Sequence, residues 1–209
     1  MIYYTADLHF GYGPVLEAAH RPFSSTEEMD EVLIENWNAQ VTDQDTVYVL
    51  GDIGGHSSPF PHTQLSRLRG HKHLVRGNHD TGFENQMQFF DYFESVTDLL
   101  ELDVGDTHLT LCHYPMVYNQ GGYMIHGHLH NKQNELYDLL QKLPRVLNAG
   151  VDINGFAPVT LETLIQNNQI FYHTPEKGYP PTRKGSHKRK WKAVFQPLPI
   201  PKENFHEKA

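Results

Sequence analysis

Five short segments of this chain place a side chain that can bind a metal directly after an apolar run. The runs are short and rich in β-branched residues, which is typical of strands, so the polar side chains fall where strands end. Ligand sites of open α/β sheets lie at the carboxyl ends of their strands. The segments that share this pattern are Asp7-Leu8-His9, Gly51-Asp52, Gly77-Asn78-His79-Asp80, His113 and Gly127-His128-Leu129-His130.

The donor types in these segments indicate the kind of metal. Carboxylate and amide oxygens occur together with imidazoles, a mixture that suits Mn²⁺, Fe or Zn better than Ca²⁺ or Mg²⁺ alone. The chain has 15 histidines, and a lone histidine is most often a surface or core residue. Core histidines, however, would not explain why an acidic or amide partner follows a strand at each of these sites. We therefore expect an assembled metal site.

Apolar periodicity predicts strands alternating with helices, which favours an α/β fold. A capping box of Ser24 and Glu27 marks the start of the clearest helix. The predicted strands are 2–6, 47–50, 73–76, 96–102, 108–112, 123–126 and 145–149, and the predicted helices are 27–40, 62–69, 84–92, 134–142 and 160–167.

In order and in local sequence, the five segments resemble the motifs of the calcineurin-like metallophosphoesterases, in particular the small stand-alone bacterial members. The resemblance runs from about Ile2 to about Val159. It implies two packed mixed β-sheets flanked by helices, a four-layer α/β/β/α sandwich. It also implies hydrolysis of phosphomonoesters or phosphodiesters by a water or hydroxide that bridges two divalent metal ions. Mn²⁺ is the expected ion, with Fe, Zn and Ni as alternatives.

The resemblance also assigns ligands and catalytic groups. It implies that His79 is the general acid. Asp80 either orients His79 or caps a helix. The first metal would be held by Asp7, His9, Asp52 and His130, and the second by Asp52, Asn78, His113 and His128.

The residues around this centre are interpreted one at a time. Arg21 has a planar guanidinium that matches a phosphate, so it either binds substrate or makes a surface salt bridge. Tyr12 stands where related small members often carry a second histidine. We expect Arg76 and Asn148 to be structural and His126 to support a ligand.

Cys112 is the single cysteine of the chain. A Cys/His hydrolase built on Cys112 and His113 is disfavoured, because successive residues on a strand point to opposite faces. We interpret Cys112 as a small buried hydrophobic residue. With one cysteine, no N-terminal secretory signal and no apolar run of 18 residues, the chain is expected to be cytoplasmic and not inserted in a membrane.

Charge divides the chain into two parts. Residues 1–170 carry 22 acidic and 8 basic side chains, a formal charge of −14, whereas residues 171–209 carry 3 acidic and 9 basic ones, a charge of +6. The second part also holds 6 of the 13 prolines. We therefore expect a folded domain over 1–170 and a basic, proline-rich C-terminal extension over 171–209.

Two function classes follow. The first is the metal-dependent phosphoesterase, acting on a small phosphate ester or a nucleotide. The second is a binding or scaffold module on the same fold, of the kind found in the retromer complex. The acidic domain lacks a broad footprint for duplex nucleic acid. A nuclease-type reading would use the basic extension as an arm for nucleic acid, with Trp191 stacking on a base; the simpler reading is a solvated tail anchored by Trp191.

Overall fold

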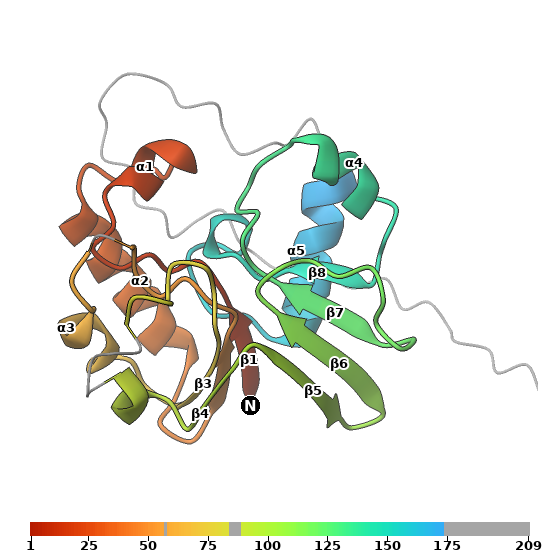
Figure 1. Ribbon diagram of the computed structural model, residues 1–209, viewed down its shortest axis with the longest axis horizontal. Coiled ribbons are helices and arrows are strands. Elements are labelled where there is room, and N and C mark those ends of the chain that lie inside the picture. Colours follow the sequence, from red (N-terminus) through yellow and green to blue (C-terminus); the bar gives the residue numbers. More distant parts are fainter. Residues whose placement is uncertain (57, 84–88, 174–209) are drawn as a thin grey trace, which may run out of the picture.

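The computed structural model describes residues 1–56, 58–83 and 89–173, and these form two four-stranded sheets (Figure 1). The first sheet is parallel throughout and contains, in spatial order, β1 (Ile2–Thr5), β2 (Thr46–Val49), β3 (His71–Val75) and β4 (Ser95–Thr97). The second contains β5 (Leu99–Val104), β6 (Thr107–Cys112), β7 (Tyr123–His126) and β8 (Val146–Asn148). There β5 runs antiparallel to β6, and the other pairs are parallel.

Five α-helices and two short 3₁₀ turns complete the described residues. The helices are α1 (Pro14–Ala18), α2 (Thr26–Gln40), α3 (His62–Leu65), α4 (Glu135–Leu140) and α5 (Leu161–His173), and the turns are η1 (Phe89–Tyr92) and η2 (Val151–Ile153). None of the helices in the described ranges combines the length and apolar character that crossing a bilayer requires.

Successive side chains on a strand point to opposite faces of the sheet, and this alternation creates the layers. On β1, Tyr3 packs with the residues of α1, α2 and α3, whereas Tyr4 packs between the two sheets. Met124 on β7 faces α4 and α5 on the outer side of the second sheet, where it meets Tyr172. The molecule is thus the expected α/β/β/α sandwich, with one parallel and one mixed sheet.

Several predicted element boundaries were wrong. The strand predicted at 96–102 is broken at Asp98, where the chain passes from the first sheet to the second. Ser25, rather than Ser24, is the N-cap of α2 and accepts the Glu28 N–H. Helix α3 covers only the start of the predicted 62–69, and α1 was not predicted. Of the helix predicted at 84–92, residues 84–88 lie outside the described residues.

Helix α5 also continues past the boundary expected at residue 170. Phe171 and Tyr172 belong to it, and Tyr172 is buried against Tyr137. The folded unit therefore includes residues 171–173, while the remainder of the predicted extension, with Trp191, lies outside the described residues.

Candidate metal centre

All seven predicted ligands lie in the loops that follow β1, β2, β3, β6 and β7, at one end of the two sheets. Two groups of donors form there. In each group the donor atoms lie within 4.8 Å of one another. The first group is Asp7, His9 and His130, and the second is Asp52, His113 and His128.

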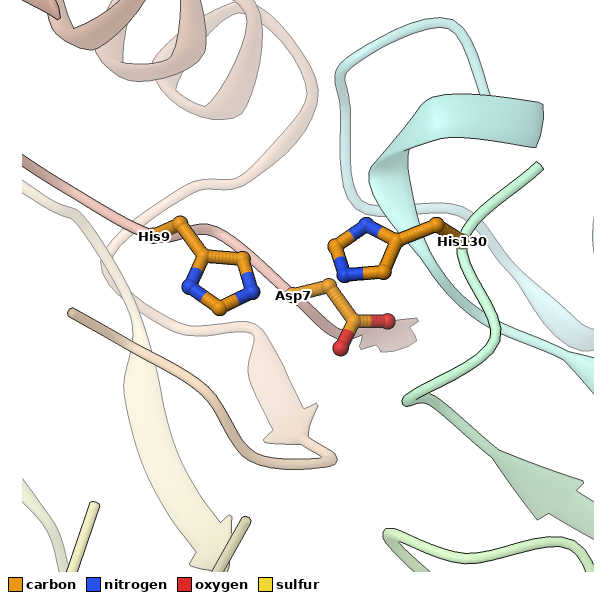
Figure 2. A group of neighbouring side chains, drawn as sticks. All are labelled: Asp7, His9 and His130. Carbon is orange, nitrogen blue, oxygen red and sulfur yellow. The ribbon is translucent and has the colours of Figure 1, made fainter. Parts of the chain in front are cut away.

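In the first group the rings of His9 and His130 flank the Asp7 carboxylate (Figure 2). The two ring centroids are 5.2 Å apart, and the planes of the rings are nearly parallel. Asp7 and His9 come from the loop after β1, and His130 comes from the loop after β7. The packing of the two sheets therefore assembles this group from segments more than 100 residues apart.

Asn78 completes the second group. Its side-chain Oδ1 lies 3.0 Å from Nε2 of His113 and 2.9 Å from Nδ1 of His128. An amide oxygen and two imidazole nitrogens thus converge on one point, beside the Asp52 carboxylate. The arrangement matches the second ligand set that the resemblance implied.

Asp52 lies between the two groups. Its Oδ2 is 3.6 Å from Nε2 of His9 and 3.5 Å from Nε2 of His113. Its Oδ1 accepts the backbone N–H of His79 at 2.8 Å, which holds the carboxylate in this orientation. Asp52 is therefore placed to contribute to both groups at once.

Three of the histidines have one nitrogen tied down and the other facing the centre. Nδ1 of His9 donates to the Gly54 carbonyl at 2.9 Å, and Nδ1 of His113 donates to the Leu50 carbonyl at 2.7 Å. Nδ1 of His130 lies 2.7 Å from Oδ2 of Asp152. A hydrogen bond at Nδ1 selects the tautomer whose Nε2 lone pair is free, the arrangement usual for metal-binding histidines.

The backbone of the site is unusual. Five of the predicted ligands have a left-handed φ, which residues other than glycine adopt only rarely. Such conformations cost free energy and cluster at functional sites, where the surrounding structure holds them in place. The values are 59° for Asp7, 54° for His9, 58° for Asp52, 71° for His128 and 53° for His130.

Glycines next to the ligands allow the loops to approach closely. A Cβ on Gly77 would lie 2.2 Å from Oδ1 of Asp52, and one on Gly51 would lie 2.5 Å from Nδ1 of His113. Because these contacts are shorter than any real Cβ contact, a side chain at either position would displace a ligand.

The buried ligands shift one another's pKa values. Burial alone would raise the pKa of the Asp52 carboxyl, but the His113 and His9 rings lower it to about 2. Burial opposes a proton on His113, yet Asp52 and Asp7 outweigh this effect and raise the pKa of the ring to about 9. For a cation to bind at Nε2 of His113, this proton must leave.

No family model matches the chain. The chain is 30% identical over 167 residues to the uncharacterized protein MJ1445 of Methanocaldococcus jannaschii, a match that covers 79% of this chain and 89% of that protein. The chain belongs to the MJ1445 family. It is also 28% identical over 183 residues to the Gene 66 protein of Mycobacterium phage D29, covering 72% of this chain and 87% of that protein.

Among solved structures, the protein of unknown function AQ665 from Aquifex aeolicus has a TM-score of 0.61 at 23% identity. The match covers 76% of this chain and 94% of that chain. This likeness shows a shared fold for the MJ1445-family chain and AQ665.

Arg21 of this MJ1445-family chain is not available to a substrate in the way the sequence suggested. Its guanidinium is buried and donates to both carboxylate oxygens of Asp152, at 2.8 and 3.1 Å. The remaining N–H groups donate to the carbonyls of Asp7 and Leu8 and to Sδ of Met29. All five donors are thus used, and the salt bridge is a buried one rather than the surface one considered as the alternative.

Asp80 has neither of the two roles considered for it. Its buried carboxylate accepts the backbone N–H groups of Asp52, Ile53 and Gly77 at 2.7 to 2.9 Å. It makes no hydrogen bond with the His79 ring and caps no helix in the described part of the chain. Burial raises the pKa of Asp80 to about 6 despite these hydrogen bonds. Its effect is to tie the loop after β2 to the loop after β3.

His79 lies at the edge of the first group. Its ring meets that of His9 edge-on at 4.9 Å and lies beside Tyr12 at 5.2 Å. The His56 N–H donates to Nδ1 of His79 at 3.3 Å, so in the neutral ring the proton resides on Nε2. Burial lowers the pKa of the His79 ring. Within the described part of the chain, no residue makes a hydrogen bond with Nε2 of His79.

The remaining residues that the sequence singled out, near the site and outside it, make distinct contacts. Asn148 donates to the His130 carbonyl at 2.8 Å, as its structural interpretation required. His126 is fully buried and donates to the carbonyl of Gly127, the residue before His128. Arg76 pairs with Asp98 at the point where the chain changes sheets. Cys112 is partly buried rather than buried as expected, and it packs against the apolar cluster under α4 and α5.

Asp152 is the functional residue that the sequence analysis missed. It lies shortly after β8 and holds both His130 and Arg21. The signal was present, because Asp152 also follows an apolar run, 145–149, that was predicted as a strand. Asn148 lies in this run and Asp152 follows four positions later, so the same strand-end signal indicates both residues.

Proposed function

We propose that this chain is a phosphoesterase that depends on two divalent metal ions and hydrolyses phosphomonoester or phosphodiester bonds. The observation that carries the proposal is the position of Asp52, whose Oδ2 lies within 3.6 Å of a donor nitrogen in each group. Cations bound by two donor groups as close together as these repel each other, so they need a shared anionic ligand. A carboxylate supplies one.

The donors fit the metals proposed. Four imidazoles, two carboxylates and one amide oxygen form a set that suits Mn²⁺, with Fe, Zn and Ni as alternatives. Bound divalent ions would withdraw charge from the phosphoryl oxygens and lower the pKa of a water in the site.

The chain itself contributes orientation and a proton donor. The carbonyls of Gly54 and Leu50 and the carboxylate of Asp152 fix the rings of three ligands. We assign to Nε2 of His79 the role of donating a proton to the departing alkoxide. The substrate would be a small phosphate ester or a nucleotide, and the single cysteine supports a cytoplasmic location.

A scaffold module on this fold is the second candidate. It would have no need for two complete donor groups with a histidine such as His79 beside them, so the geometry favours the enzyme. A nuclease-type variant that uses the basic extension depends on residues outside the described part of the chain.

Asp52→Asn tests the proposal. The amide removes the charge shared by the two groups, so we expect metal content to fall from two ions per chain and turnover of bis(p-nitrophenyl) phosphate with Mn²⁺ to fall by more than about 100-fold. Loss of groups that merely support a ligand already costs about 10- to 100-fold. Asp103→Asn, at an exposed position on β5, is the matched control. Full turnover with a single bound ion would contradict the dinuclear model.

A further inference from the structure

The segment that follows His113 exposes apolar and aromatic side chains beside the second donor group. Tyr114 is 50% exposed, Val117 70% and Tyr118 74%. Large apolar side chains are normally withdrawn from water, and contiguous exposed ones mark binding surfaces. The position of this segment, directly after a predicted ligand, connects it to the metal centre.

Tyr114 is the member of the segment that touches the centre. Its ring packs edge-on against His128, at 4.8 Å between centroids, and against His113, at 5.2 Å. Within the described residues its hydroxyl makes no hydrogen bond, so only ring contacts hold it. Because the residue is 50% exposed, Tyr114 remains accessible to a ligand bound at the same histidines.

Tyr114 and His79 contact different donor groups. The His79 ring lies against His9 of the first group, whereas Tyr114 lies against His113 and His128 of the second. If His79 serves the leaving oxygen, as proposed above, Tyr114 is placed for the other substituent on phosphorus. A phosphodiester has such a substituent, the alcohol that stays attached.

We propose that Tyr114 is a specificity-determining residue that stacks on a nucleobase carried by the retained alcohol of a phosphodiester substrate. The inference rests on the proposed function and names its substrate class. Aromatic side chains stack on any base, because every base has a π-face. The charge of −14 over residues 1–170 opposes long polyanions, so a substrate with a single base fits better than a polymer.

Two substrates with the same leaving group test this proposal. The p-nitrophenyl ester of thymidine 5′-phosphate and methyl p-nitrophenyl phosphate both release nitrophenol when water attacks phosphorus and the P–O bond to the nitrophenyl group breaks. They differ in the retained group, a nucleoside or a methyl. With Mn²⁺ supplied, we expect kcat/KM of the wild type to be higher for the nucleoside ester by about tenfold or more.

Tyr114→Ala should reduce that preference by about tenfold, whereas Tyr114→Phe, which keeps the ring, should retain it. Leu139→Ala, at an exposed apolar position on α4, is the control and should also retain it. Calorimetric binding of thymidine 5′-monophosphate and of methyl phosphate to the Mn²⁺-loaded protein gives a second readout. The ratio of the two dissociation constants should change in Tyr114→Ala in the same direction.

The outcomes separate the two proposals. If neither diester is cleaved, this inference fails, and the phosphoesterase proposal fails with it if the monoester p-nitrophenyl phosphate is not cleaved either. If both are cleaved but the wild type shows no preference, or Tyr114→Ala keeps the preference, only the role of Tyr114 is overturned. A change of oligomeric state in Tyr114→Ala with the preference intact would assign the surface to a protein partner, and would overturn it as well.

Discussion

At the scale of single residues, the centre depends on side chains that never face it. Asp152 connects the buried Arg21 to His130, and Asp80 connects two ligand loops through backbone N–H groups. Burial alone would raise the pKa of Asp152, but Arg21 and His130 lower it well below its usual range. The carboxylate is therefore ionised and keeps Nδ1 of His130 as a donor.

Arg21→Met should be strongly destabilising. Removing the guanidinium leaves the Asp152 carboxylate buried with an incomplete set of partners, which typically costs about 3–5 kcal/mol. Urea unfolding at pH 7 measures the change. Arg67→Met is the control, because Arg67 pairs with Glu31 on the surface, and exposed pairs contribute only about 0–1 kcal/mol. Equal losses in the two variants would show that the buried pair has no special role.

His79→Ala should separate a general acid from a ligand. A strongly basic alkoxide needs a proton to depart, whereas a nitrophenolate does not. We therefore expect the variant to lose much more activity on alkyl phosphate esters than on nitrophenyl esters, with metal content unchanged. Measured losses that are equal on both substrates, or loss of bound metal, would reject the assignment.

At the scale of elements, the predicted ligands lie on loops rather than on helices and strands, and the helices hold the loops. Asp30 of α2 accepts the Gly11 N–H with both carboxylate oxygens at 3.1 Å, and it accepts from Gln64 of α3 at 2.8 Å. The loop after β1 is thereby fastened to two helices.

Asp30 also makes the stability of the fold depend on pH. Burial is the main cause that raises the pKa of Asp30 in the folded chain. A carboxyl whose folded pKa exceeds its unfolded value of about 3.9 stabilises the fold below that pH, and this contribution is lost as pH rises through the folded pKa.

Asp30→Asn removes the titration while keeping an acceptor for Gly11. The free energy of unfolding of the variant, relative to the wild type, should therefore increase as pH rises from about 4 through the folded pKa of Asp30. Urea unfolding of both proteins with EDTA across this range measures it. A difference that does not vary with pH would contradict the raised pKa.

At the scale of the whole molecule, three apolar clusters separate four layers, and the end of α5 closes the outer one. Tyr172 is buried there, Tyr137 donates to the Phe171 carbonyl and Gln141 donates to the Tyr172 carbonyl. The folded unit therefore includes residues 171–173, which charge alone placed in the extension.

Truncation locates this boundary. A chain ending at His173 should keep turnover of a small ester, whereas one ending at Ile170 loses the buried Tyr172 and should be less stable by on the order of 3 kcal/mol. Thermal and urea unfolding compare the two. If residues 174–209 capture nucleic acid, the full chain should bind short RNA at low salt and the His173 truncation should bind it more weakly. No measurable affinity of the full chain would remove that role.

The sequence by itself determined which residues lie at the centre and the general fold, because side-chain chemistry and strand periodicity are local properties. Seven ligand positions could be named because five short segments resemble known motifs. The alternation of strands and helices indicated an α/β fold, and the resemblance implied its four layers. Strand ends such as those before Asp7 and Asp52 are visible without any knowledge of what packs against them.

Only the tertiary structure decided what depends on distance between remote segments. Tertiary packing places Asp52 between the two groups and brings Asp152 to His130. It also pairs Arg21 with Asp152, which lies 131 positions away in the sequence. The same packing buries Asp80 and leaves Tyr114 half exposed. A side chain's burial and partners are set by its surroundings in space, and a linear pattern does not contain them.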